Sequence, residues 1–191
     1  MENYKISINT QVKIALLSVI GFILMFLSTP LIIFPSFLRL DISDLPEVIA
    51  WMQFGLLGGI LTALLKNVLH LFITQSAGIG ELINFIVASL YLISLNLVFR
   101  KAKSLKISLI VGTIFIGILS IPVNRYIMFP LYEAILHIRP ENIVSLAAKS
   151  NPLIKNLNFY LALIIMPFNL FKFLVVSILS YSLKGILKIK I

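Results

Sequence analysis

The sequence lacks the residues on which several classes of chemistry depend. It contains no cysteine, which excludes disulfides, thiolate nucleophiles and zinc-thiolate sites. His70 and His137 are its only histidines, and neither has a carboxylate at metal-ligand spacing, so we expect no metal site. No glycine-rich loop ends in Lys-Ser or Lys-Thr, and no pair of acids or of serine with histidine marks an intramembrane protease. We therefore expect a protein that is not an enzyme, with no catalytic residues and no cofactor.

Charged residues are scarce, and acids are the scarcer kind. Charged residues make up 12% of the 191 residues, against about 25% in soluble domains. Hydrophobic residues make up 60%, and the mean hydropathy is +1.07. This composition predicts an all-α integral membrane protein of the cell membrane, with a single transmembrane domain over residues 1–191.

The basic residues flank the apolar runs and do not form one continuous patch. The chain has 16 Lys and Arg against 7 Asp and Glu, for a net charge of +9. Nine of the sixteen lie in three short segments: Lys5 and Lys13; Arg100, Lys101, Lys103 and Lys106; Lys184, Lys188 and Lys190. This arrangement is typical of cytoplasmic loops and ends of membrane proteins, so we expect no nucleic-acid binding.

The apolar runs predict spans at about 14–29, 45–56, 60–74, 81–99, 107–126 and 157–183. A single helix over residues 45–74 would be about 45 Å long, well beyond the ~30 Å hydrocarbon core of a bilayer. A break within Gly55-Leu56-Leu57-Gly58-Gly59 gives two short helices and six spans in all. Both termini and every basic cluster then lie on the cytoplasmic side, and all acids except Glu2 lie outside.

The first two spans are joined by a long outer segment, residues 30–46, which is apolar and interrupted by prolines. We expect it to pack on the protein as a lid. Its end has the pattern of a helix start, with Asp44 as N-cap, Pro46 in the first turn and Glu47 as the capping-box acid. A short amphipathic helix is expected near 141–149 in a second outer connection, residues 129–155.

Lys172 and Asn169 lie in the middle of the last apolar run. They are three residues apart, so they share one face of a helix, and Pro167 opens or kinks that helix beside them. A lysine at the bilayer centre costs about 2.5–3.5 kcal/mol unless it faces a protein interior or a polar cavity. Two interpretations are open: Lys172 lines a polar ligand site, or it reaches the surface or neighbouring carbonyls along its own stem.

Other polar side chains occur in the outer halves of the predicted spans. Asn84 and Asn124, together with Asn169, offer carboxamides that both donate and accept hydrogen bonds, as recognition of a heterocycle with imide and carbonyl groups requires. For any one of them an interhelical hydrogen bond of ~0.6 kcal/mol is an equal alternative. Three more polar residues lie in the third predicted span: Lys66, Asn67 beside it, and His70 one turn further on. They either form a second polar pocket or satisfy backbone groups where the short helices turn.

Several motifs resemble, in order and spacing, the riboflavin-specific S component of energy-coupling factor (ECF) transporters. The resemblance covers almost the whole chain. The motifs are Ile14-Ala15-Leu16-Leu17-Ser18, Phe34-Pro35, Leu40-Asp41-Ile42-Ser43-Asp44-Leu45-Pro46, Leu65-Lys66-Asn67-Val68-Leu69-His70, Gly80-Glu81-Leu82-Ile83-Asn84-Phe85, Asn124 before Pro130-Leu131-Tyr132, and Pro167-Phe168-Asn169-Leu170-Phe171-Lys172.

This resemblance implies six helices with cytoplasmic ends and a riboflavin pocket in the outer half, closed by the first loop. It implies that Asn124, Asn169 and Lys172 contact the flavin and that Leu40 and Asp41 cover it. We add Asn84 and Phe34 as candidate contacts on the same side of the membrane.

The resemblance also implies partners: a transmembrane coupling subunit and two cytoplasmic ATPase subunits. S components dock through small residues of the first span. Here the usual Ala-x-x-x-Ala motif is imperfect, since Ala15 is followed by Val19, with Ser18 keeping that side small. The expected function is capture of riboflavin from outside for ATP-driven uptake. The alternatives are an S component for another vitamin, or a membrane assembly protein whose polar residues only join helices.

Overall fold

The structure is a computed structural model, and it describes residues 7–30, 34, 38–74 and 76–189. Glu2, Lys5, Lys190 and the Pro35 of one motif, on which parts of the sequence analysis rest, lie outside the described residues.

The first helix, α1, spans Ile8–Phe26 and begins earlier than expected. The reason is local: the Ser7 hydroxyl accepts a hydrogen bond from the Thr10 amide at 3.3 Å and so caps the helix. The buried residues of α1 are Ile14, Ser18 and Gly21, which form one narrow stripe. The rest of its surface is largely apolar and exposed, as expected for a helix that faces lipid or another membrane protein.

The segment after α1 folds back on itself through a minimal pair of strands. β1 (Thr29–Pro30) pairs antiparallel with β2 (Arg39–Leu40), so that Thr29 lies opposite Leu40. Arg39 fastens this pair, because its guanidinium donates to the hydroxyl of Ser28 at 2.9 Å and to the Ser28 carbonyl at 2.7 Å. The connection therefore starts and ends at one place beside the end of α1.

The second helix, α2 (Leu45–Leu71), is broken at Gly55, whose φ of 75° and ψ of −173° are not helical. Only glycine adopts this backbone readily. The two halves pack closely, since a Cβ added at Gly59 would lie 3.0 Å from the Trp51 Cβ and 3.1 Å from the Glu47 carbonyl oxygen. The break lies within the Gly55–Gly59 stretch that the sequence analysis singled out.

The predicted capping box at the start of α2 is wrong. Asp44 occupies the N-cap position, but its side chain makes no capping hydrogen bond. The carboxylates of Asp44 and Glu47 instead bind the ammonium of Lys66, at 2.9 and 2.5 Å. A buried cation is a stronger partner for a carboxylate than a backbone amide, so the tertiary contact prevails over the local motif.

The remaining helices follow α2 in the chain. They are α3 (Ile79–Ala102), α4 (Leu105–Val123) with its continuation through the π-helical turn η1 (Asn124–Met128) into α5 (Phe129–Leu136), α6 (Pro140–Ser150), and α7 (Leu157–Tyr160) with its continuation through η2 (Leu161–Ile165) into α8 (Met166–Ile186). Of these, α3 and α8 pack against α2. The short helix expected near 141–149 is α6.

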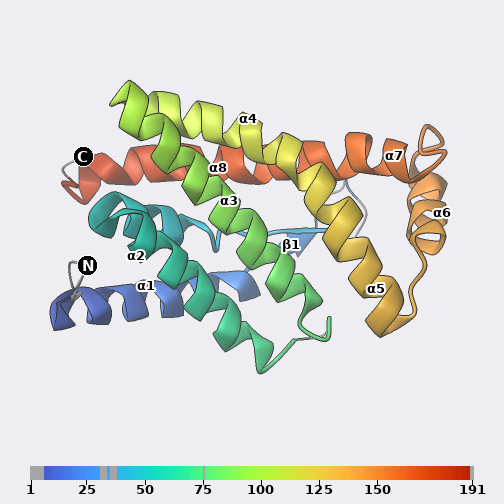
Figure 1. Cartoon of the computed structure of the whole chain (residues 1–191), viewed down its shortest axis with the longest axis horizontal. Helices are drawn as coiled ribbons and strands as arrows, with labels where there is room; N and C mark the ends of the chain where they lie inside the picture. The colour runs from blue at the N-terminus through green and yellow to red at the C-terminus, as the bar shows by residue number, and fades with distance from the viewer. Residues whose placement is uncertain (1–6, 31–33, 35–37, 75, 190–191) are drawn as a thin grey trace.

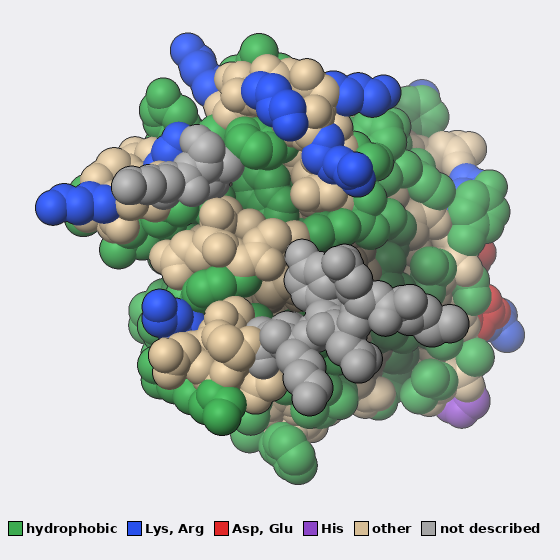
Figure 2. All heavy atoms as spheres, turned by 60° about the vertical axis from the view of Figure 1, so that its left-hand side comes forward, with side chains coloured by type: hydrophobic (Ala, Val, Ile, Leu, Met, Phe, Trp, Pro, Cys, Tyr) green, Lys and Arg blue, Asp and Glu red, His purple; other side chains and the backbone are tan. Residues whose placement is uncertain are grey.

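Five helical segments among the described residues are long and apolar enough to cross a membrane: Ile8–Phe26, Leu45–Leu71, Ile79–Ala102, Leu105–Leu136 and Leu157–Ile186. In Figure 1 the start of α1, the junction of α3 with α4 and the end of α8 lie at one end of the molecule, and α6 lies at the other. Figure 2 looks toward the first of these ends, where lysine and arginine side chains gather.

Candidate ligand-binding site

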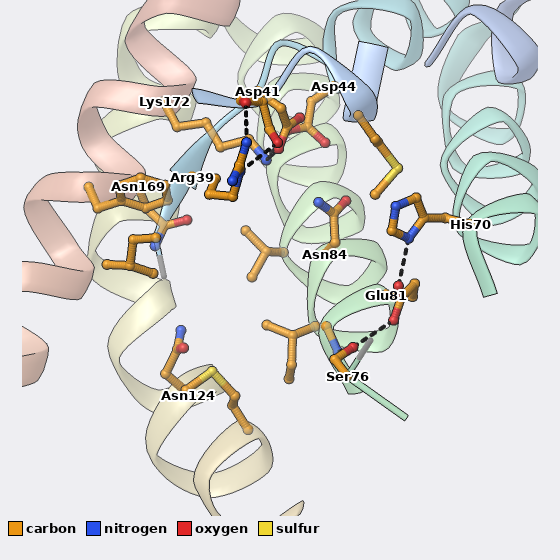
Figure 3. A pocket seen from close by; sticks show the side chains of 18 of the residues that line it. Arg39, Asp41, Asp44, His70, Ser76, Glu81, Asn84, Asn124, Asn169 and Lys172 are labelled. Carbon is orange, nitrogen blue, oxygen red and sulfur yellow. Dashed lines mark hydrogen bonds and ion pairs between the residues drawn. The ribbon is translucent and has the colours of Figure 1, made fainter. Parts of the chain in front are cut away.

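A cavity of about 880 Å³ lies between α1, α2, α3, η1 and α8, beside the β2 segment. Five of the residues proposed from the sequence line it: Asp41, Asn84, Asn124, Asn169 and Lys172. Figure 3 shows the side chains of η1 and α8 on one side of this space and those of α2 and α3 on the other. Residues more than a hundred positions apart in the chain thus meet at one site.

Asn124 and Asn169 each lie in or beside a π-helical turn. Asn124 begins the π-helical turn η1, and Asn169 follows the end of η2 by one turn. The helix after each π-helical turn has a proline as its second residue, Pro130 in α5 and Pro167 in α8. Each carboxamide nitrogen donates to the carbonyl four residues earlier, Asn124 to Ser120 at 2.7 Å and Asn169 to Ile165 at 2.9 Å. π-Helical turns widen a helix locally and are frequent at functional sites.

These internal bonds fix both carboxamides and leave their oxygens as acceptors. No described residue donates a hydrogen bond to Oδ1 of either Asn124 or Asn169. Asn84 is oriented the other way: its Oδ1 accepts from Lys66 Nζ at 3.2 Å, so its amide hydrogens remain to be donated. The cavity therefore presents acceptors from η1 and α8 and a donor from α3.

Lys172 extends from α8 toward the β2 segment, where two carboxylates meet it (Figure 3). Its Nζ lies 2.7 Å from Asp44 Oδ2 and 3.4 Å from Asp41 Oδ2, and the residue is 7% exposed. An ammonium group has three hydrogens, so pairing with two carboxylates leaves one for a ligand. Of the two interpretations open from the sequence, the structure agrees with a lysine that lines a polar cavity.

Asp44 joins two buried lysines. Its Oδ1 lies 2.9 Å from Lys66 Nζ, and its Oδ2 faces Lys172. Asp44 precedes the membrane-spanning part of α2. Burial alone would raise the pKa of its carboxyl, but the positive charges of Lys172 and Lys66 outweigh burial and lower the pKa to about 2. Asp44 is therefore ionised at neutral pH and holds α8 to α2.

Lys66 is fully buried behind the cavity. Besides Asp44 and Glu47, its ammonium contacts the Ser43 hydroxyl at 3.0 Å. Gly21 makes room for this side chain, since a Cβ there would lie 3.0 Å from Lys66 Cδ. The expectation that Lys66 forms a pocket or satisfies backbone groups is therefore wrong. The signal for its true role was present in the sequence, because Lys66 lies in an apolar run just as Lys172 does.

The other two residues of that motif differ from each other. Asn67 does satisfy the backbone, donating to the Ala63 carbonyl at 2.8 Å. His70 does not, because its Nδ1 lies 2.6 Å from Glu81 Oε1 on α3. Glu81 also accepts a hydrogen bond from the Ser76 hydroxyl at 2.9 Å. His70, Glu81 and Ser76 all line the cavity. The sequence analysis did not assign Glu81 or Ser76 to a binding site.

Two of the residues proposed from the sequence do not line the cavity. Phe34 lies behind it, where its ring meets that of the lining residue Phe168 edge to face at 5.3 Å between centroids. Leu40 lies in β2, between the lining residues Arg39 and Asp41. Both therefore adjoin the wall of the cavity.

The residues proposed for docking do not all lie on the same face of α1. Ala15 and Val19 are exposed and lie one turn apart on the same face. Ser18 is buried, 1% exposed, and its hydroxyl donates to the Ile14 carbonyl at 2.8 Å. The prediction that Ser18 belongs to the docking face is therefore wrong, since its side chain faces the inside of the protein.

Comparison with known proteins gives consistent results. The family model for the substrate-specific component of ECF transporters matches residues 9–183. The chain is 32% identical over 170 residues to the riboflavin transporter RibU of Staphylococcus aureus (strain TCH60), covering 87% of this chain and 84% of that protein. It is 33% identical over 175 residues to the riboflavin transporter FmnP of Bacillus subtilis (strain 168), covering 87% and 85%.

A solved structure agrees with these relatives. The structure described as the S component of a bacterial ECF transporter superposes with a TM-score of 0.74 at 28% identity, covering 94% of this chain and 95% of that one. The relatives are transport proteins, in agreement with the expectation that the chain is not an enzyme. The protein belongs to the family of substrate-specific S components of ECF transporters, multi-pass proteins of the cell membrane.

Proposed function

We propose that this S component captures riboflavin from outside the cell for ATP-driven uptake. The observation that carries the proposal is the cavity itself, where Asn124 and Asn169 offer acceptors and Asn84 and Lys172 offer donors. Two relatives of similar length are named as riboflavin transporters, which supports the same ligand.

The pattern of donors and acceptors suits the polar edge of the flavin ring. That edge carries an imide N–H between two carbonyl groups, so it requires an acceptor and donors from the protein. The carboxamide oxygen of Asn124 or of Asn169 accepts from the N–H, and the third hydrogen of Lys172 bonds a carbonyl. The faces of the ring lie against apolar lining side chains, including Phe168 and Phe173. Leu40 and Phe34 hold the covering segment in place around this site.

The topology that best fits this function has six passes, with both termini in the cytoplasm. The start of α1 and the end of α8 lie at the same end of the molecule, which an even number of passes requires (Figure 1). Counting the two halves of α2 on either side of Gly55 as separate passes turns five into six. The basic side chains at that end (Figure 2) favour its cytoplasmic location.

Transport requires partners that supply ATP hydrolysis, namely a transmembrane coupling subunit with two ATPase subunits. We propose that α1 docks on the coupling subunit through the exposed face that carries Ala15 and Val19. Alanine leaves room there for the close approach of a second helix.

Replacing Ala15 with tryptophan is expected to abolish riboflavin uptake by cells that express the whole complex, because the indole keeps the partner helix away. Riboflavin binding by the purified chain should not change, since Ala15 does not line the cavity. The matched control is Ile114→Trp, at an exposed position of α4. Normal uptake by the Ala15→Trp variant would remove this face of α1 from the docking surface.

Equilibrium titration of the detergent-solubilised protein tests the function directly. Riboflavin should bind with a Kd of order nanomolar, because nearly complete burial of a flat ring supports affinities near ~12 kcal/mol. Thiamine and biotin, which lack the imide-bearing ring of riboflavin, should not compete. Tight binding of another vitamin in place of riboflavin would assign a different substrate, and failure of every vitamin to bind would favour an assembly protein.

A further inference from the structure

The end of the cavity formed by α2 and α3 carries a carboxylate that the ring-binding scheme does not use. Glu81 is 5% exposed, and its two oxygens are held by His70 at 2.6 Å and by Ser76 at 2.9 Å. Ser76 is itself fixed, because its hydroxyl accepts from the Gly80 amide at 2.9 Å and lies 3.1 Å from the Thr74 hydroxyl. Glu81 is therefore a rigid acceptor at the wall of the cavity, opposite α8 (Figure 3).

Glu81 differs from the other carboxylates around the cavity in its charged partners. Among the described lining residues there are three carboxylates, Asp41, Asp44 and Glu81, and two permanent cations, Arg39 and Lys172, which gives a formal charge of −1 with His70 neutral. Lys172 is occupied by the first two carboxylates. Glu81 has no lysine or arginine partner in the described part of the chain, so it repels anions more than the other two do.

Glu81 lies at the end of the cavity where the ribityl chain of riboflavin would be placed. When the polar edge of the ring lies against η1 and α8, the ribityl chain has the α2 and α3 end of the cavity available to it. The hydroxyl groups of that chain are donors, which a carboxylate accepts readily. Flavin mononucleotide (FMN) carries a phosphate at the end of the same chain, with a charge of about −1.5 to −2 at neutral pH, as for phosphate esters in general.

We propose that Glu81 is a specificity-determining residue that selects riboflavin over its phosphate ester. It accepts hydrogen bonds from the ribityl hydroxyl groups and repels the phosphate of FMN. His70 and Ser76 are positioning residues that hold its carboxylate toward the cavity. This inference rests on the proposed function, since it assumes that the cavity binds a flavin.

The test is the ratio of the dissociation constants for FMN and riboflavin. Glu81→Gln keeps the size of the side chain and removes its charge, so the ratio should fall about tenfold or more, because like charges a few ångströms apart interact strongly in a cavity. Glu133→Gln, at an exposed position of α5, is the matched control and should leave the ratio unchanged. An unchanged ratio in Glu81→Gln, with both ligands weakened equally, would assign Glu81 a structural role only and overturn the proposal.

A second variant covers the case in which Glu81→Gln does not fold. Ile73 lines the same end of the cavity and is 46% exposed, and Ile73→Lys adds a cation there while leaving Glu81 and its partners in place. FMN should bind this variant more tightly relative to riboflavin than it binds the wild type. No relative gain for FMN would place the phosphate elsewhere and contradict the proposal. If the wild-type protein binds neither flavin, the proposed function itself fails, which distinguishes the two outcomes.

Discussion

Replacing Lys66 with methionine is expected to lower the midpoint of thermal unfolding by about 10 °C, the largest stability change we expect from any single substitution here. Lys66 is fully buried, and its ammonium is shared by Asp44 and Glu47. Methionine fills most of the space but leaves two buried carboxylates facing each other with less compensation. Removing one partner of a buried ion pair costs about 3–5 kcal/mol.

Thermal unfolding of the detergent-solubilised protein, followed by loss of the monodisperse peak in size-exclusion chromatography, measures this effect. Lys101→Met, at an exposed position near the end of α3, provides the control for losing a lysine without losing a buried pair. A midpoint for Lys66→Met as high as that of Lys101→Met would show that the cluster does not stabilise the fold.

Replacing Lys172 with methionine is expected to weaken riboflavin binding about 100-fold, the largest affinity change predicted here. The variant loses the donor to a flavin carbonyl, and it leaves Asp41 and Asp44 without the ammonium that offsets their charge. A carbonyl of the ligand then faces uncompensated negative charge. Titration with riboflavin measures the change, and Lys155→Met, outside the cavity, is the control.

A double variant separates the two contributions. In Asp41→Asn with Lys172→Met, one negative charge and the ammonium are removed together, so the charge around the cavity is the same as in the wild type. If Lys172 bonds the ligand directly, the double variant remains weak. Recovery of wild-type affinity in the double variant would show that Lys172 serves only to balance Asp41.

The sequence predicted the features that depend on composition and local geometry. The apolar runs located the membrane-spanning segments. The break at Gly55 was predicted because one helix over residues 45–74 is too long for the thickness of the bilayer and contains a cluster of glycines. Asn124, Asn169 and Lys172 were found because each is a polar side chain in an apolar run, where only a protein interior or a cavity accommodates it. Their convergence on one cavity is a property of the tertiary structure.

What the sequence analysis missed are pairings between distant residues. Asp44 and Glu47 matched a capping box, a pattern of four residues that carries no information about a lysine about three turns beyond the Gly55 break. Lys66 was assigned either to a second polar pocket or to backbone groups where the short helices turn, although the argument used for Lys172 applied to it equally. Ser18 was placed on the outside because small residues are typical both of docking faces and of tightly packed interiors, and burial decides between them.

The most direct test of the central claim is the visible absorption spectrum of the protein purified in detergent from cells grown with riboflavin. The account predicts a yellow protein with the spectrum of a bound flavin, released on denaturation in a ratio near one flavin per chain and identified as riboflavin by chromatography. A colourless protein that also fails to take up added riboflavin would contradict the assignment of the cavity lined by Asn124, Asn169 and Lys172 as a flavin site.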